Sequence, residues 1–276
     1  MSYDKTVSEH YTHGGLLGAI KASITKLGKT IDSVTIEDLA PVDEFHIGGR
    51  QATDNLLGQL GFSESDHILD VGCGLGGASR YIADKLGNRV TGIDLTREYI
   101  DVGKVLCAWV GLDKQVCLHQ GSALSMPFAD AIFDGAIMLH VGMNIENKLG
   151  LFTEIHRVLR PGASIGVYDV MRINEGELVY PVPWATEDIT SKLATADQYG
   201  QALTNAGFDA HEENLRREFA IEFFRHMKAK TSVNDASPAI GIHILMQEGA
   251  ALKIKNMVEN IGKNLIAPVE IIAKKT

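Results

Sequence analysis

Short apolar runs separated by amphipathic stretches occupy the middle of the chain. The apolar runs predict β-strands at residues 68–71, 89–93, 116–120, 133–139 and 164–169. Helical spacing of apolar positions predicts helices at residues 77–86 and 98–110, between the first three strands. Alternating strands and helices predict an α/β fold with a doubly wound, mostly parallel sheet, for which we expect seven strands.

The amphipathic stretch after the fourth strand predicts a helix that Asn144 caps and that runs through Val158. The apolar side chains expected to face the sheet from this helix are Ile145, Leu149, Phe152 and Leu159. Further helices are predicted at residues 197–206, 219–227 and 248–261, and a last strand at 269–274. No helix follows that strand, so it is free to return antiparallel to its neighbour.

The first sixty residues precede the first predicted strand and carry a separate pattern. Helices are predicted at residues 16–29 and 51–60, with a short helical piece at 35–39 that Pro41 stops. We therefore expect residues 1–60 to form a helical N-terminal extension, or lid, over a domain of residues 61–276.

Composition restricts the class of protein. The chain has 276 residues, 45% of them hydrophobic, which suits one large α/β domain with a lid. Its formal net charge of −9, without a basic stretch, argues against a nucleic-acid partner. No segment predicts a membrane span or a signal peptide. Three cysteines without metal-ligand spacing predict no metal site and a reducing, cytoplasmic setting.

A glycine-rich turn follows the first strand, in the segment Asp70-Val71-Gly72-Cys73-Gly74-Leu75-Gly76-Gly77. Gly72 and Gly74 can adopt backbone angles that a Cβ forbids, and they let a ligand approach the main chain. The second strand also ends in an acid, Asp94, whose carboxylate can accept both hydroxyl protons of a ribose. This pattern is typical of a βαβ nucleotide-binding unit.

Two cofactors fit this unit. Gly72, Gly74 and Gly77 match the G-x-G-x-x-G fingerprint of dinucleotide-binding proteins. A dinucleotide would place its pyrophosphate on the turn, where the carboxylate of Asp70 would repel it. S-adenosyl-L-methionine brings an ammonium and a sulfonium instead, so Asp70 favours this cofactor over NAD. A turn without any ligand does not require so many glycines.

The expected site continues along the carboxyl ends of the strands, where ligands of open α/β sheets bind. The candidate cofactor-binding residues are Asp70, Gly72, Cys73, Gly74, Gly76, Asp94, Leu95, Thr96, Ser122, Ala123 and Leu139. Ser122 is expected either to contact the adenine edge or to be only a turn residue, and Cys73 to be a small residue that fits the turn. His140 follows the fourth strand directly and can take a proton near neutral pH, or it is a structural histidine at a strand end.

The candidate substrate-binding residues are His46, Met143, Asn144, Tyr168, Tyr180 and Trp184. His46 is expected to face the cleft from the lid, or to make a structural hydrogen bond. Tyr11, in the extension, is expected to cap the cofactor or to lie on the surface. We expect three aromatic side chains, those of Tyr168, Tyr180 and Trp184, to hold a cationic amine by cation–π attraction or to serve only as hydrophobic cover for the sheet.

The chain resembles the class I S-adenosylmethionine-dependent methyltransferases over nearly all of its length, which implies their Rossmann-like fold. The matching segments are 69–76, Gly92-Ile93-Asp94, Met126-Pro127-Phe128 before Phe133-Asp134, and 157–162. Segments 43–49, 140–144 and 181–185 are similar to the sarcosine and dimethylglycine N-methyltransferase branch. Phosphoethanolamine methyltransferases, a more distant likeness, latch the site with a tyrosine and a histidine, which implies Tyr11 and His140 here. The aspartate that often follows strand three in the family is replaced by Ser122.

The resemblance implies methyl transfer to a small-molecule acceptor, above all to an amine nitrogen, with His140 and Tyr11 as the catalytic residues. His140 would take or relay the amine proton, or only position the substrate. The alternatives are an O- or C-methyltransferase of a small metabolite and a cofactor-binding protein without catalysis. The sequence determines neither the acceptor nor the oligomeric state.

Overall fold

The computed structural model describes residues 3–233, 239–246 and 249–276. Its centre is a seven-stranded sheet with the strand order β3-β2-β1-β4-β5-β7-β6. The strands are β1 (His67–Val71), β2 (Arg89–Asp94), β3 (Val116–Gln120), β4 (Phe133–Leu139), β5 (Leu159–Arg172), β6 (Phe208–Leu215) and β7 (Ile266–Lys275). Strands β1 to β5 pair in parallel, and β7 lies antiparallel between β5 and β6. The last strand therefore does return antiparallel.

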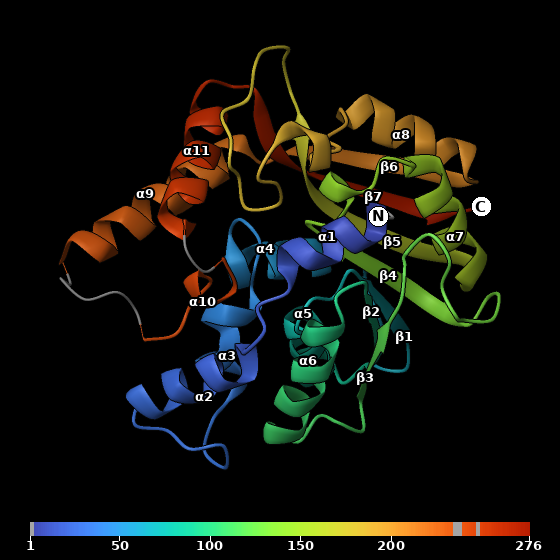
Figure 1. Ribbon diagram of the computed structural model, residues 1–276. Helices are drawn as coiled ribbons and strands as arrows, with labels where there is room; N and C mark the ends of the chain where they lie inside the picture. Colours follow the sequence, from blue (N-terminus) through green and yellow to red (C-terminus); the bar gives the residue numbers. More distant parts are fainter. Residues whose placement is uncertain (1–2, 234–238, 247–248) are drawn as a thin grey trace.

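Helices cover both faces of the sheet (Figure 1). The α-helices are α1 (Tyr3–Tyr11), α2 (Leu16–Lys26), α3 (Ile36–Asp43), α4 (Gly49–Leu57), α5 (Gly77–Leu86), α6 (Arg97–Trp109), α7 (Lys148–Val158), α8 (Ala196–Asn205), α9 (Arg217–Val233), α10 (His243–Met246) and α11 (Ala250–Gly262). Two 3₁₀ turns, η1 (Gly142–Asn144) and η2 (Asp188–Thr190), follow β4 and β5. The described helices include none with the length and apolarity needed to cross a membrane.

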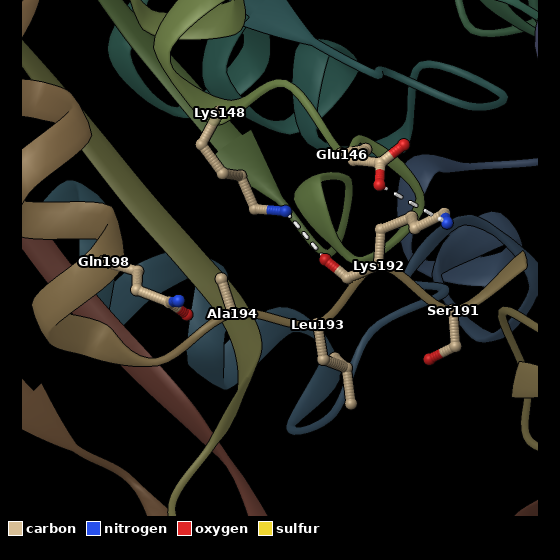
Figure 2. Close-up of a pocket in the computed structure, with 7 residues that line it drawn as sticks. All are labelled: Glu146, Lys148, Ser191, Lys192, Leu193, Ala194 and Gln198. Atoms are coloured by element: carbon tan, nitrogen blue, oxygen red, sulfur yellow. Dashed lines mark hydrogen bonds and ion pairs between the residues drawn. The ribbon is translucent and has the colours of Figure 1, made fainter. Parts of the chain in front are cut away.

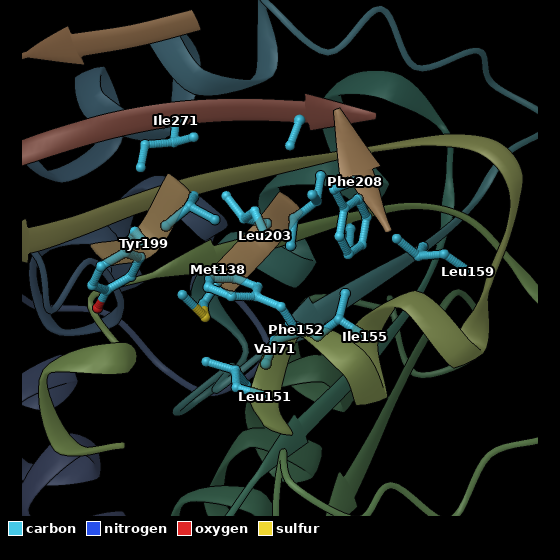
Figure 3. Close-up of a cluster of buried hydrophobic side chains, with 14 of the residues drawn as sticks. Val71, Met138, Leu151, Phe152, Ile155, Leu159, Tyr199, Leu203, Phe208 and Ile271 are labelled. Atoms are coloured by element: carbon cyan, nitrogen blue, oxygen red, sulfur yellow. The ribbon is translucent and has the colours of Figure 1, made fainter. Parts of the chain in front are cut away.

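Side chains of β1 alternate between two cores, because successive residues of a strand point to opposite faces. Ile68 joins the core beneath α4, α5 and α6, and Leu69 and Val71 join the core beneath α7 and α8. Figure 3 shows the second core, where Phe152 and Leu203 pack against the sheet. Both cores hold the strand ends in a fixed register, so the residues that follow those ends are positioned by the whole sheet.

The N-terminal helices are docked on the domain. Apolar side chains of α2 and α3 share a core with Tyr99 and Leu106 of α6 and with residues of α10. The turn between α1 and α2 is clamped by Glu98, whose carboxylate accepts the backbone N–H groups of residues 13 to 16 at 2.5–3.0 Å. Burial raises the pKa of Glu98, but the four backbone bonds outweigh that effect and lower its pKa overall.

Several expectations about local structure are wrong. Pro41 lies inside α3 and does not stop it, since a proline there removes only one backbone donor from a short helix. Asn144 belongs to η1, and α7 is capped instead by Asn147, whose side chain accepts from the Gly150 N–H at 2.8 Å. Leu149 consequently points to solvent and is 46% exposed.

Other elements were misplaced or missed. The strand expected at 164–169 already begins at Leu159, and neither β6 nor α1 was predicted. The helix expected at 219–227 extends over α9. The helix expected at 248–261 is α11, which begins at Ala250 after its N-cap Gly249, and Glu248 lies outside the described residues.

Candidate active site

The carboxyl ends of β1, β2, β4 and β5 lie along one edge of the sheet, and α1 crosses this edge (Figure 1). Three side chains of α1 attach it there. Tyr11 Oη donates to Asn144 Oδ1 at 2.8 Å, Tyr3 Oη donates to the Thr190 carbonyl at 3.2 Å, and His10 Nε2 lies 3.1 Å from the Pro183 carbonyl. The extension therefore covers the strand ends where the sequence predicts the ligand site.

The glycine-rich turn requires glycine for two reasons. Gly72, Gly74 and Gly76 have φ angles of 70°, 54° and 76°, which L side chains rarely adopt. A Cβ at position 72 would also meet Cγ2 of Val141 at 2.3 Å. The Gly72 and Cys73 N–H groups donate to the Ile93 carbonyl at 2.8 and 3.0 Å, which ties the turn to the end of β2.

Asp94 closes the turn from the β2 side. Its Oδ2 accepts from the Gly74 N–H at 2.9 Å and its Oδ1 from the Thr96 N–H at 2.8 Å. Burial raises the pKa of Asp94, and these backbone bonds oppose the rise. Each carboxylate oxygen can accept a further hydrogen bond, so ribose hydroxyls can bind without displacing the loop contacts.

Asp70 differs from the sequence-based expectation that its charge faces a ligand. It is 2% exposed, and its Oδ2 accepts from Ser79 Oγ on α5 at 2.6 Å. Burial raises the pKa of Asp70 to about 7, so near neutral pH a large part of it is protonated. Its hydrogen bond with Ser79 links β1 to α5.

The remaining candidate cofactor residues border the turn. Thr96 is 2% exposed and is the N-cap residue of α6, but its side chain makes no capping hydrogen bond. The Leu95 carbonyl accepts from Gln120 Nε2 at 3.2 Å. Ser122 Oγ accepts from the Leu124 N–H at 3.4 Å, which is a turn contact, and its neighbour Ala123 packs on the core. Leu139 packs on the other core, and burial raises the pKa of the Cys73 thiol, which disfavours a reactive thiolate.

Tyr11 and Tyr99 form the aromatic cover of the edge. Their ring centroids are 6.1 Å apart, and Phe45 lies 6.5 Å from Tyr11. Burial raises the pKa of Tyr11, and the carboxylates of Asp94 and Asp169 add to the rise, so its hydroxyl stays protonated. Tyr99 Oη is buried without a hydrogen-bond partner among the described residues. Tyr99, which the sequence reasoning missed, is therefore an orphaned donor beside the glycine turn.

His140 occupies a strained position at the end of β4. Its φ is 54°, an uncommon value for a residue with a side chain, and its N–H donates to the Tyr168 carbonyl at 2.7 Å. Its Nε2 is buried without a partner among the described residues. Burial lowers the pKa of His140 well below its usual range, so the imidazole is neutral at pH 7.

His46 lies beside His140, with ring centroids 5.9 Å apart. Its Nε2 is 3.1 Å from the Gly49 carbonyl, 3.1 Å from Thr53 Oγ1 and 3.4 Å from Glu44 Oε2. Tyr168 packs against both imidazoles, at 6.2 Å from His46 and 5.1 Å from His140. The structure thus brings two predicted histidines and one predicted tyrosine together.

The other candidate substrate residues have mainly structural contacts. Trp184 is 2% exposed inside a core and its Nε1 donates to Ser191, so its ring does not offer a face to a cation. Met143 is 3% exposed in the same core, and Tyr180 packs against it. Tyr168 is fully buried and its hydroxyl donates to the Ile47 carbonyl at 2.9 Å. These contacts are those expected of hydrophobic cover for the sheet, and the cation-binding alternative stays a prediction.

Asn144 connects the lid to the loop after β5. Its Oδ1 accepts from Tyr11, and its Nδ2 donates to the carbonyls of Trp184 and Thr190 at 2.9 and 3.1 Å. Asp169 of β5 holds η1 and α8, because its Oδ2 accepts from the Gly142 N–H at 2.8 Å and from Tyr199 Oη at 2.7 Å. Burial raises the pKa of Asp169 to about 6. The rule that ligands bind at strand ends marked position 169, but nothing in the sequence revealed this contact.

A hollow of about 320 Å³ lies beyond this loop, between the residues that precede α7 and those that precede α8 (Figure 2). Lys148 Nζ points into it and donates to the Lys192 carbonyl at 2.7 Å, and Glu146 pairs with Lys192 at 3.7 Å. The residues that line this hollow include none from the glycine turn.

The residues at the strand ends fit S-adenosylmethionine. A Cβ at Gly74 would make only an ordinary van der Waals contact, with the Tyr99 ring at 4.0 Å. Asp94 has acceptor capacity for ribose hydroxyls, and Tyr99 Oη and His140 Nε2 are buried polar atoms that lack partners in the described chain. These three features are those of a site for a polar, ribose-containing ligand.

The strand order and the glycine turn are those of the Rossmann-like fold of class I S-adenosylmethionine-dependent methyltransferases, a class whose cofactor is S-adenosylmethionine. The family model described as "Methyltransferase domain" matches residues 69–167, which run from Leu69 in β1 through Val167 in β5. This match sets aside the dinucleotide alternative.

Three comparisons illustrate the similarity. O-methyltransferase resE of Aspergillus sclerotiorum is 31% identical over 134 residues, which are 49% of this chain and 51% of that protein. The chain thus aligns with about half the length of this relative. Phosphoethanolamine N-methyltransferase 2 of Haemonchus contortus, in complex with S-adenosyl-L-methionine, superposes with a TM-score of 0.77 at 18% identity over 100% of this chain and 60% of that one. Geranyl diphosphate C-methyltransferase of Streptomyces coelicolor A3(2) superposes with a TM-score of 0.71 at 17% identity, over 100% of this chain and 98% of that one. The two structures show the shared fold.

Proposed function

We propose that the protein transfers a methyl group from S-adenosylmethionine to a small molecule whose acceptor is an amine nitrogen. The observation that carries this proposal is the pair of imidazoles, His46 and His140, packed against Tyr168 beside the glycine turn. An amine must react as the free base, so a neutral imidazole near the acceptor can receive its proton. The shared fold extends to an N-methyltransferase and to a C-methyltransferase alike, so the choice of an amine rests on the two imidazoles.

The bound cofactor supplies an activated methyl group on a sulfonium, which needs no further activation by the protein. The chain's own part is to hold the cofactor, align the acceptor with the methyl carbon, and exclude water. Asp94 would hold the ribose, and the glycine turn would lie along the cofactor with its main chain. Tyr11 of the lid and Tyr99 of α6 would cover the site together.

We further propose that residues 1–60 act as the lid over a methyltransferase domain of residues 61–276. The support is that α1 is held over the strand ends by three side-chain hydrogen bonds, including the one from Tyr11 to Asn144. Cofactor exchange would then require α1 to lift, while α2 stays fixed by its core contacts.

The test is methyl transfer from S-[methyl-³H]adenosylmethionine to a panel of small acceptors. The panel contains glycine, sarcosine, dimethylglycine and phosphoethanolamine as amines, and several phenols as oxygen acceptors. Label on an amine supports the proposal. Label only on a phenol replaces the amine by a hydroxyl acceptor, as the name of the resE relative suggests.

A further inference from the structure

The environment of His46 fixes which of its nitrogens carries the proton. The Gly49 carbonyl, 3.1 Å from Nε2, is only an acceptor. Thr53 Oγ1 gives its proton to Glu44 Oε2 at 3.0 Å, so it too presents a lone pair to Nε2. Glu44 Oε2 itself lies 3.4 Å away. Three oxygen acceptors around Nε2 require it to be the protonated nitrogen, which leaves the lone pair of the neutral ring on Nδ1.

Nδ1 of His46 is available to a ligand. It makes no hydrogen bond to any residue that the structure describes, and it is not among the buried polar atoms that lack a partner. The His46 side chain is only 5% exposed, so this nitrogen meets little bulk water. It therefore has the properties of a proton acceptor in a largely enclosed site.

His46 and His140 differ in the charged groups around them. The groups that face His46 are Glu44 at the end of α3, Arg50 of α4, His140 after β4, and Tyr168 of β5. Burial lowers the pKa of His46, Glu44 opposes this change, and Arg50 adds to it. Burial and the neighbouring His46 both lower the pKa of His140, and no carboxylate pairs with it in the described chain. A proton is thus better stabilised on His46.

Glu44 is itself rigidly held. Arg50 Nε donates to Glu44 Oε1 at 2.5 Å, and the Arg50 guanidinium lies 3.9 Å from the ring centroid of Tyr81. The Glu44 side chain is 5% exposed. A fixed carboxylate behind an imidazole orients the ring and stabilises the imidazolium that forms when the ring accepts a proton.

We propose that His46, oriented by Glu44, is the imidazole that receives the amine proton, and that His140 positions the amine beside it. This inference rests on the proposed N-methylation. The proton leaves the amine nitrogen for the lone pair of His46 Nδ1. The freed lone pair of the nitrogen forms the new N–C bond, the C–S bond of the donor breaks, and its electron pair stays on sulfur. His46 then releases the proton to water. Glu44 is a positioning residue, because it acts through His46.

The kinetic test uses His46→Gln, His140→Gln and Glu44→Gln, with melting temperature and S-adenosylmethionine affinity measured for each. H46Q should lower kcat by roughly 10²–10⁴-fold while cofactor affinity stays near that of the wild type, and H140Q should mainly raise KM. E44Q should lower kcat by roughly 10–100-fold and move the acidic limb of the pH–rate profile to lower pH, because the imidazolium loses its carboxylate.

The matched controls repeat these changes elsewhere. His67→Gln removes a half-buried histidine whose Nε2 also contacts a threonine hydroxyl, at 2.8 Å, and Glu154→Gln weakens a Glu–Arg pair on α7. Both should keep the wild-type kcat and pH profile. If the wild type is active, either of two results overturns this inference: an unchanged kcat in H46Q, or an acidic limb of the pH–rate profile that does not move in E44Q. Both results leave the proposed function intact.

A second measurement needs no substrate. ¹⁵N-histidine NMR of the whole protein reads the tautomer of His46 directly, with H46Q identifying its signals. The proton on Nε2 in the wild type, and a lower pKa of this histidine in E44Q, support the inference. The proton on Nδ1 overturns it even if amines are methylated. Failure of the wild type to methylate any amine instead refutes the proposed function.

Discussion

The clamp between Glu98 and the turn before α2 makes a sharp prediction about the lid. Glu98 Oε2 accepts the N–H groups of His13 and Gly14 at 2.5 and 2.8 Å, and Oε1 accepts those of Gly15 and Leu16 at 2.9 and 3.0 Å. Glu98→Gln replaces one of these oxygens by an NH₂ group, which cannot accept. Two of the four backbone donors therefore lose their partner.

The size of the effect follows from these bonds. A hydrogen bond of this kind contributes about 1 kcal/mol net, and more when the acceptor is charged. Because the turn is partly exposed, water replaces some of the loss, so we take about 2 kcal/mol for the two bonds together. That corresponds to a roughly 30-fold larger population of the open lid.

Hydrogen exchange measured by mass spectrometry tests this number. In E98Q, peptides covering residues 3–16 should exchange roughly 30-fold faster, while peptides from β1 and β4 should not change. Asp101→Asn is the matched control on the same helix, since Asp101 pairs with the exposed Arg97 at 3.0 Å. Equal protection of residues 3–16 in E98Q and D101N would refute the clamp.

The clamp also predicts a pH dependence. The pKa of Glu98 is lowered in the folded protein, so the stabilisation is complete above the ordinary pKa of a glutamate and is lost as the pH falls through the lower, folded value. Exchange of residues 3–16 in the wild type, corrected for intrinsic rates, should therefore accelerate in acid, and in E98Q this acceleration should be absent.

Three further substitutions probe the site. Gly72→Ala should lower the free energy of unfolding by roughly 1–3 kcal/mol in urea titrations, because its Cβ would meet Val141 at 2.3 Å, whereas Gly14→Ala has open space and should cost less. Asp94→Asn should weaken S-adenosylmethionine binding roughly 10–100-fold in calorimetry, and unchanged affinity would remove Asp94 from the cofactor site. Tyr11→Phe should lower kcat more than cofactor affinity, since it removes the hydroxyl bonded to Asn144, and equal kcat would leave Tyr11 with a packing role only.

The sequence predicted the sheet well where its pattern is strong. The bounds of α5, β3 and β4 match the expectations, since these strands and this helix have clear periodicity and glycine or polar ends. β6 was missed because its sequence, FDAHEENL, is mostly polar and its pairing depends on β7. The cap of α7 was misjudged because two asparagines lie three residues apart, and only tertiary packing selects Asn147.

The candidate site was predictable in its location and less so in its contacts. The glycine turn, Asp94 and His140 were expected at one edge of the sheet, because the carboxyl ends of parallel strands meet there and ligands of open α/β sheets bind at those ends. The network of Glu44 with Arg50 and Thr53, and the clamp from Glu98, join residues whose contacts have no short-range pattern. The buried state of Asp70 was also hidden, because a carboxylate at a strand end can face either the ligand or the following helix.

The measurement that tests the central claim most directly is transfer of labelled methyl from S-adenosylmethionine to the amine panel, by the wild type and by D94N. The account predicts label on an amine with the wild type and a rise in the KM for S-adenosylmethionine with D94N. Two results would contradict amine methylation. In the first, the wild type labels only oxygen acceptors. In the second, the wild type binds the cofactor but labels no small molecule, even in a whole-metabolite extract.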